Sequence, residues 1–203
     1  MIGELGAMAL VAYLVGSVPT GYVLARLKRV DVRTVGSGNI GATNVARTAG
    51  KGLGIATLVF DAAKGALPVL VAAALAPEIH SGARFATALQ CVAALGAVVG
   101  HVFSIALRFR GGKGVATALG AIAALDPSVL WAPLVVFAIA FALSRRVSLG
   151  SILAAASAPL AALLVGSSSL VVLTLVLIAA IIIARHRENI RRLQAGTEPR
   201  FSA

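Results

Sequence analysis

The segment of residues 35–47 carries the side chains best suited to binding an anion. Its glycines allow turns that direct backbone N–H groups toward one point, and Ser37, Thr43 and Asn44 add neutral hydrogen-bonding groups. Arg47 ends the segment with a planar guanidinium, which can hold a phosphate through two hydrogen bonds. This combination predicts a phosphate-binding loop. A flexible polar connector is the alternative.

A second glycine-rich segment, residues 100–117, predicts another anion site. Lys113 stands among three glycines and directly before an expected helix, whose first N–H groups and positive dipole end attract anions. The segment is not a nucleotide-binding P-loop, because the required spacing is absent and no strand precedes it. Ordinary positive charges beside a membrane span would explain Arg108 and Arg110, but not the glycines.

The third candidate is the basic segment near the C-terminus. On a continuing helix, His186 and Asn189 are three residues apart and share a face, as do Arg187 and Arg191 at a spacing of four. Binding of anionic lipid headgroups would account for the arginines, but not for the paired histidine and asparagine.

Two further signals are weaker. The basic turn at residues 144–151 is more typical of membrane topology than of a site. Asp61 and Lys64 are three residues apart within an apolar stretch, where ionisable groups are costly, so they predict either a functional pair or an internal structural pair.

Composition defines the environment in which these segments must fold. Of the 203 residues, 59% are hydrophobic and 12% charged, and the mean hydropathy is +0.97, whereas a soluble domain has roughly a quarter charged residues. The sequence therefore predicts a single all-α membrane domain over residues 1–203 with seven transmembrane helices. The expected spans are residues 2–25, 53–76, 85–107, 115–125, 129–143, 149–165 and 170–184.

Charge placement predicts the orientation. In the seven-span arrangement, all of the 18 lysines and arginines except Lys64 and Arg84 lie on one side, which the positive-inside rule makes the cytoplasm. The N-terminus is then outside and the C-terminus cytoplasmic. The short fourth and fifth spans could instead form one helix kinked at Pro127, but that would carry the arginine-rich tail outside, so we favour two helices.

The same distribution limits the chemistry. Cations and neutral donors gather on one membrane face with few carboxylates, which suits two phosphate groups rather than nucleic acid, despite the net charge of +11. No cluster with metal-ligand spacing and no Ser-His-Asp pattern is present, so neither a metal nor a serine nucleophile is expected. Cys91, as a single cysteine, cannot form an internal disulfide.

Residues 36–44, 100–117 and 185–190, in this order, resemble the motifs of the bacterial membrane-integral acyl-phosphate:glycerol-3-phosphate acyltransferases. The resemblance covers nearly the whole chain, with one departure at Ser104, where the family favours proline. It implies transfer of a fatty acyl group from acyl phosphate to the 1-hydroxyl of glycerol 3-phosphate, without a cofactor. It also implies that the site lies on the cytoplasmic face of the bacterial inner membrane and that membrane lipid surrounds the protein. A soluble enzyme that produces acyl phosphate is implied as a possible partner.

On this basis we expect the first segment to bind the donor phosphate and the other segments to bind glycerol 3-phosphate. The expected acyl-phosphate ligands are Ser37, Gly38, Asn39, Gly41, Thr43 and Asn44. The expected glycerol 3-phosphate ligands are Arg47, Lys113, Ser151, His186 and Asn189. Ser37, Lys113, His186 and Asn189 are expected to be catalytic, with His101, Arg110, Gly112 and Ser148 as further candidates.

Two questions stay open at the level of sequence. The proton of the attacking hydroxyl could pass to His101, to His186 or to a phosphate oxygen of the donor. The rival functions are a transporter of a phosphorylated anion, whose site would lie near the membrane midplane, and a scaffold whose basic loops bind anionic lipid.

Overall fold

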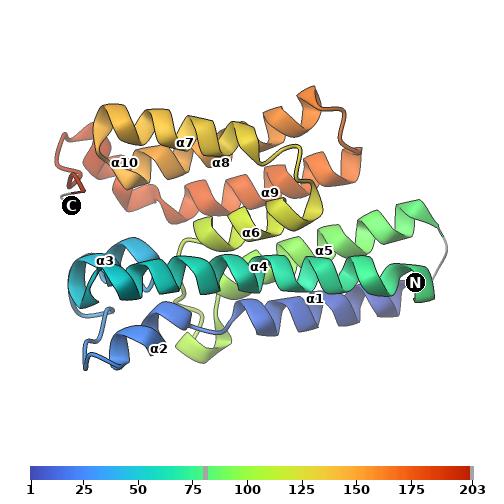
Figure 1. The fold of residues 1–203 in the computed structure, drawn as a ribbon, viewed down its shortest axis with the longest axis horizontal. Coiled ribbons are helices and arrows are strands. Elements are labelled where there is room, and N and C mark those ends of the chain that lie inside the picture. Colours follow the sequence, from blue (N-terminus) through green and yellow to red (C-terminus); the bar gives the residue numbers. More distant parts are fainter. Residues whose placement is uncertain (80–81, 202–203) are drawn as a thin grey trace. The chain divides into compact units, whose positions relative to one another are not determined.

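The computed structural model describes residues 1–79 and 82–201, and every regular element within these ranges is a helix (Figure 1). The expectation of an all-α protein is therefore confirmed for the described residues. The chain divides into two compact units, Met1–Leu125 and Asp126–Ala203.

The first unit is built on long apolar helices. Helix α1 packs along α5, and α4 packs against both α5 and α6. Short helix α2 precedes the first glycine-rich loop and short helix α3 follows it. A short 3-10 helix, η1, precedes the second glycine-rich loop. The bounds are α1 (Ile2–Gly16), α2 (Thr20–Arg26), α3 (Ala42–Ala49), α4 (Lys51–Ile79), α5 (Ala83–Val102), η1 (Ile105–Leu107) and α6 (Val115–Leu125).

Small residues allow the close helix packing in this unit. A Cβ atom on Gly100 of α5 would collide with the backbone of Tyr13 in α1, and one on Gly120 of α6 would collide with the backbone of Ala62 in α4. The missing side chain at these two positions is therefore what lets the helix backbones approach closely.

The second unit consists of helices joined by short turns. Its helices are α7 (Trp131–Ser144), α8 (Val147–Leu164), α9 (Ser169–Arg185) and α10 (Arg187–Gln194), with α8 packed against α7 and α9. Asp126 ties the start of the unit to the turn between α8 and α9, because Ser128 Oγ donates to its Oδ1 at 2.5 Å and Ser167 Oγ donates to its Oδ2 at 2.6 Å.

Within residues 1–79 and 82–201, four stretches are long and apolar enough to cross a membrane, or five if the bent pair α9 and α10 counts as one span, which makes this a multi-pass membrane protein. Helices α6 and α7 are apolar but shorter. They are separate helices, since residues 126–130 between them are not helical. The four stretches are Ile2–Arg26, Lys51–Ile79, Ala83–Leu107 and Val147–Leu164. Seven spans and the orientation of the termini stay predictions.

The expected continuous helix through His186 is wrong. Helix α9 ends at Arg185, α10 begins at Arg187, and the axes differ by 60°. The physical reason lies in composition and in contacts. Helix α9 is apolar on all sides, whereas α10 is polar and its buried Asn189 bonds to a carboxylate downstream in the chain.

Candidate active site

Asn44 organises the first glycine-rich loop. It lies buried in α3, its Oδ1 accepts from the Ser37 amide at 2.9 Å, and its Nδ2 donates to the carbonyls of Val32 at 2.9 Å and Asn39 at 2.8 Å. A third carbonyl, that of Val35, lies 3.2 Å from Nδ2. One side chain therefore holds the loop from within.

The loop amides are arranged differently from the expectation. The Ser37 N–H is taken by Asn44, the Gly38 N–H donates to Val35 O at 3.1 Å, and the Gly41 N–H donates to Asn39 Oδ1 at 2.8 Å. These three groups are engaged inside the loop and do not converge on an external point. Of the first amides of α3, those of Asn44 and Val45 donate to Gly41 O at 3.0 and 3.2 Å. The amides of Ala42 and Thr43, at the very start of the helix, can therefore face an anion.

Gly36 is required for this arrangement. Its φ is +61°, in the left-handed region, and a Cβ there would overlap Asn44 Oδ1. Ser37, next to it, is exposed, as is Arg47 near the end of α3. The first loop thus places an exposed hydroxyl and an exposed guanidinium at the two ends of one structured segment.

A small apolar core lies beneath the first loop. Its buried members come from α2, the loop, α3 and η1, so the loop is anchored to two neighbouring helices and to the segment before the second glycine-rich loop. These residues are Ala25, Val32, Ile40, Val45 and Leu107.

His101 supports the second glycine-rich loop. Its side chain is buried in the last turn of α5, and its backbone carbonyl accepts from the Gly112 N–H at 3.1 Å. A Cβ on Gly112 would overlap His101 Nε2, so the loop packs directly on the imidazole. Lys113 follows at once and is half-buried, whereas Arg110 is exposed. The geometry makes His101 a support for the Lys113 loop.

Asp61 and Lys64 form the ion pair that their spacing predicted, with Lys64 Nζ 2.8 Å from Asp61 Oδ1 and both side chains buried. Two partners were not foreseen. Thr20 Oγ1 donates to Asp61 Oδ1, and His101 Nδ1 lies 3.6 Å from the same oxygen. The usable signal was the cost of a charged group at membrane depth, which requires partners from neighbouring helices.

His186 is almost fully buried at the junction of α9 and α10, and its Nδ1 lies 2.8 Å from the carbonyl of Ile182. A carbonyl oxygen only accepts hydrogen bonds, so Nδ1 carries a proton. In the neutral ring, Nε2 is then the acceptor. The imidazole is therefore oriented to receive a proton, or a hydrogen bond from a hydroxyl, at Nε2.

Glu198 is the residue that sequence reasoning missed. It is buried, and its Oε1 accepts from Ser148 Oγ and from Asn189 Nδ2, both at 2.6 Å, while Arg192 Nε donates to Oε2 at 2.7 Å. Burial raises the pKa of this carboxyl, but the three hydrogen bonds outweigh burial and hold the pKa below its ordinary value. A carboxylate shortly after an arginine-rich helix was the available signal.

The expected residues thus fall into two clusters. The first unit holds the Ser37–Asn44 loop, Arg47, and the His101-supported loop of Gly112 and Lys113. The second unit holds His186, Asn189, Ser148 and Ser151, of which Ser151 is buried one turn along α8 and donates to Val147 O at 2.9 Å. In the described residues no group of three or more His, Cys, Asp or Glu side chains that could hold a metal ion occurs.

A multi-pass helical framework with cationic and neutral polar loops defines a membrane-integral protein suited to phosphorylated ligands. The family model described as glycerol-3-phosphate acyltransferase matches residues 6–196. This chain belongs to the glycerol-3-phosphate acyltransferase family, and it is an acyltransferase.

Named relatives cover the full length of the chain. The glycerol-3-phosphate acyltransferase of Geobacter sulfurreducens is 50% identical over 203 residues, which is 100% of both chains. That of Trichlorobacter lovleyi is 50% identical over 95% of each. Crystal structures of PlsY (YgiH), an integral membrane glycerol 3-phosphate acyltransferase, match as well. Its glycerol 3-phosphate form is 42% identical with a TM-score of 0.89, covering 98% of this chain and 96% of that one. Its lysophosphatidic acid form is 41% identical with a TM-score of 0.87, covering 98% and 95%.

Proposed function

We propose that this protein transfers a fatty acyl group from acyl phosphate to the 1-hydroxyl of glycerol 3-phosphate, producing lysophosphatidic acid and inorganic phosphate. The observation that carries the proposal is the full-length likeness to PlsY, whose two structures hold the acceptor substrate and the acylated product. The acyl-phosphate donor rests on the motif resemblance.

The donor is a mixed anhydride, so its carbonyl is already activated. The protein must position the two substrates and stabilise the charge that develops on the carbonyl oxygen. No cofactor or covalent acyl-enzyme is needed for this chemistry. The reaction forms an ester bond to the glycerol oxygen, breaks the bond between the acyl carbon and the phosphate oxygen, and moves the hydroxyl proton to a base.

The first loop is proposed to bind the donor phosphate. Ser37 and Thr43 supply hydroxyl groups, and the first amides of α3 supply N–H donors with the positive end of the helix dipole. Asn44, whose amide is engaged within the loop, acts by holding this shape. Gly38, Asn39 and Gly41 act in the same way, through the backbone path that they allow.

The proposed ligands of glycerol 3-phosphate are cationic and neutral polar side chains. Arg47 and Lys113 neutralise its phosphate, and His186, Asn189 and Ser151 hold its glycerol part. A single acyltransferase domain over residues 1–203 is part of the proposal, and the family model supports it by matching residues 6–196.

Two groups could accept the proton of the attacking glycerol 3-phosphate hydroxyl. His186 offers Nε2, since its Nδ1 carries a proton toward Ile182. The alternative acceptor is a phosphate oxygen of the donor, which is released as phosphate in the same step. His101 is the weaker candidate, because its ring is packed between Asp61 and Gly112.

The pH profile of His186→Ala distinguishes these routes. A loss beyond about 10³-fold with the basic limb abolished indicates a protein base, and a modest loss with an unchanged limb indicates the substrate.

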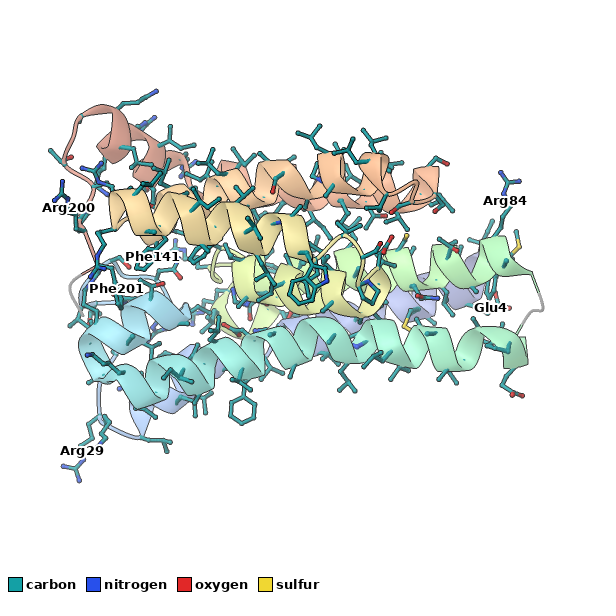
Figure 2. All side chains as sticks on the ribbon, turned by 45° about the horizontal axis from the view of Figure 1, so that its top comes forward. Glu4, Arg29, Arg84, Phe141, Arg200 and Phe201 are labelled. Atoms are coloured by element: carbon teal, nitrogen blue, oxygen red, sulfur yellow. The ribbon has the colours of Figure 1, made fainter. Side chains whose placement is uncertain are left out.

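The proposed topology has seven spans, an external N-terminus and a cytoplasmic C-terminus in the bacterial inner membrane. Within the first unit, Figure 2 places Arg29 at one end and Glu4 and Arg84 at the other. The first glycine-rich loop follows Arg29, so it lies at the end of the unit assigned to the cytoplasm. A soluble enzyme that makes acyl phosphate is the partner that this reaction requires.

The direct test is an assay of the purified protein with synthetic acyl phosphate and glycerol 3-phosphate. Phosphate and lysophosphatidic acid should form in equal amounts, and replacing acyl phosphate with acyl-CoA should give no product. Product from acyl-CoA alone would contradict the donor assignment. Counterflow of labelled glycerol 3-phosphate in proteoliposomes without acylation would favour a transporter.

A further inference from the structure

The chain folds back on itself after α10. Gly196 has a φ of +72°, and the amides of Thr197 and Glu198 both donate to Arg192 O, at 2.8 and 3.1 Å. Pro199 and Thr197 are exposed, whereas Glu198 between them is buried. The turn thus directs this one side chain inward.

The returning segment is fastened to the α7–α8 turn. Arg146 Nε donates to Glu198 O at 3.2 Å, and the Phe201 amide donates to Arg145 O at 2.7 Å. Phe201 also packs edge-on against Phe141, with ring centroids 6.2 Å apart, and Figure 2 shows the two rings beside one another. The basic turn that the sequence suggested was topological therefore anchors the C-terminal segment.

The Glu198 carboxylate joins two helices that carry expected substrate ligands. It accepts from Ser148 in the first turn of α8 and from Asn189 in α10, and Arg192 balances its charge at 2.7 Å. Because all three donors are directed at two oxygens, the acidic group does not present a free negative charge to an anionic substrate.

The identity of the side chain matters at this position. An ionised carboxylate only accepts hydrogen bonds, so it fixes the Asn189 amide with Nδ2 toward Glu198 and Oδ1 on the opposite side. A glutamine has one oxygen for the three donors, and its own N–H₂ group would confront either Arg192 or the pair of Ser148 and Asn189. Buried donors that lose their acceptor are costly, so the amide would reorient.

We infer that Glu198 is a positioning residue for glycerol 3-phosphate acylation. It fixes the orientation of the Asn189 amide and holds α10 against the start of α8, so that Asn189 is preset for the acceptor substrate. This inference rests on the proposed assignment of Asn189 to glycerol 3-phosphate.

The test compares Glu198→Gln with the control Glu188→Gln, which removes an exposed carboxylate from α10, the helix that carries Asn189. Initial rates are measured while each substrate is varied in turn, and thermal unfolding is followed in detergent. Glu198→Gln should raise the KM for glycerol 3-phosphate about tenfold, as expected for loss of one hydrogen bond to a charged group, and change the KM for acyl phosphate less than about twofold. Glu188→Gln should match the parent. A purely structural role would lower the melting temperature and leave both KM values unchanged, and that result would overturn the inference.

A double-mutant cycle tests whether Glu198 acts through Asn189. Asn189→Ala combined with Glu198→Gln should be no worse than Asn189→Ala alone, and effects that multiply would overturn the inference. An effect of Asn189→Ala on the KM for glycerol 3-phosphate with none from Glu198→Gln refutes the inference and leaves the site assignment standing. A parental KM in Asn189→Ala refutes the site assignment and the inference with it.

Should Glu198→Gln fail to fold, Glu198→Asp is expected to raise the KM for glycerol 3-phosphate by a smaller factor. A parental KM in Glu198→Asp would overturn the inference.

Discussion

Single polar residues in this protein act mainly by holding backbone in place. The Asn44 side chain hydrogen-bonds to three carbonyls and one amide of the preceding loop. The His101 imidazole packs against the loop of Gly112 and Lys113. Side chains that sequence motifs assign to substrate therefore divide into those that can touch a ligand, such as Ser37 and Lys113, and those that shape the surface on which it binds.

Replacing Asn44 with aspartate tests this division. The variant keeps an acceptor for the Ser37 amide but sets an oxygen against the carbonyls of Val32 and Asn39. We expect a loss of about 2–3 kcal/mol in the free energy of unfolding, because buried acceptors lose their donor, together with a raised KM for acyl phosphate. Unfolding in a denaturant series and substrate titrations measure the two effects. Asn39→Ala, which removes a single bond to the Gly41 amide, is the control, and an equal effect of the two variants would contradict the special role of Asn44.

The low pKa of Glu198 predicts how stability responds to acid. Burial alone would raise this pKa, but hydrogen bonds from Ser148, Asn189 and Arg192 lower it beneath the reference value of 4.5. A carboxyl group whose pKa is lower in the folded state contributes stability above its unfolded pKa and loses that contribution as the pH falls through the folded pKa. The difference in melting temperature between the parent and Glu198→Gln should therefore be constant near neutral pH and shrink below about pH 4.5. A difference that grows on acidification would contradict this account.

At the scale of helices, breaks are stabilised by side chains from neighbouring helices. The interruption between α1 and α2 breaks the regular helical hydrogen-bond pattern at Ser17 and Val18. Lys64 Nζ donates to Val18 O at 2.7 Å, and Ser104 Oγ donates to Ser17 O at 2.5 Å. Ser104, where the resembled family favours proline, thus has a structural partner in this chain. The Lys64 ammonium group thus donates to the Val18 carbonyl at the break and also pairs with the Asp61 carboxylate.

Substituting Lys64 with methionine should destabilise the first unit strongly. The change leaves Asp61 as a buried charge without its cation, which costs about 3–5 kcal/mol. Replacing both members, as Asp61→Asn with Lys64→Met, should restore part of this loss, since the uncompensated charge is then absent. Unfolding free energies of the parent, Lys64→Met and the double variant measure the effect. A double variant less stable than Lys64→Met alone would rule out the ion pair as the cause. Lys51→Met, at the exposed start of the same helix, is the control.

At the scale of the whole molecule, the positive-inside rule predicts that the glycine-rich loops and the C-terminal segment face the same compartment. Cysteine labelling checks this arrangement. Cys91 is buried and is replaced by serine to give a background without thiols. In intact cells, a membrane-impermeant maleimide should label Arg84→Cys but not Arg29→Cys or Gln194→Cys, and all three should react after the cells are opened. Labelling of Arg29→Cys in intact cells would reverse the proposed orientation.

Much of the architecture could be predicted because a bilayer imposes simple rules. Apolar stretches must satisfy their backbone hydrogen bonds internally, so long stretches such as residues 53–76 and 85–107 can only be helices there. The separation of the fourth and fifth spans near Pro127 was predicted from charge placement, and the pairing of Asp61 with Lys64 from their spacing within an apolar stretch. The bend at His186 was not, because it depends on where α10 finds hydrogen-bonding partners.

The sequence by itself determined the helical membrane class, the family and the segments that carry polar chemistry, since these follow from local composition and from motif order. Only the tertiary structure decided which polar group satisfies which. Thr20 bonds Asp61 across 41 residues, and Ser148 bonds Glu198 across 50. Such pairs have no fixed spacing, because they arise where packed helices bring a buried donor and a buried acceptor together and neither can be left unsatisfied.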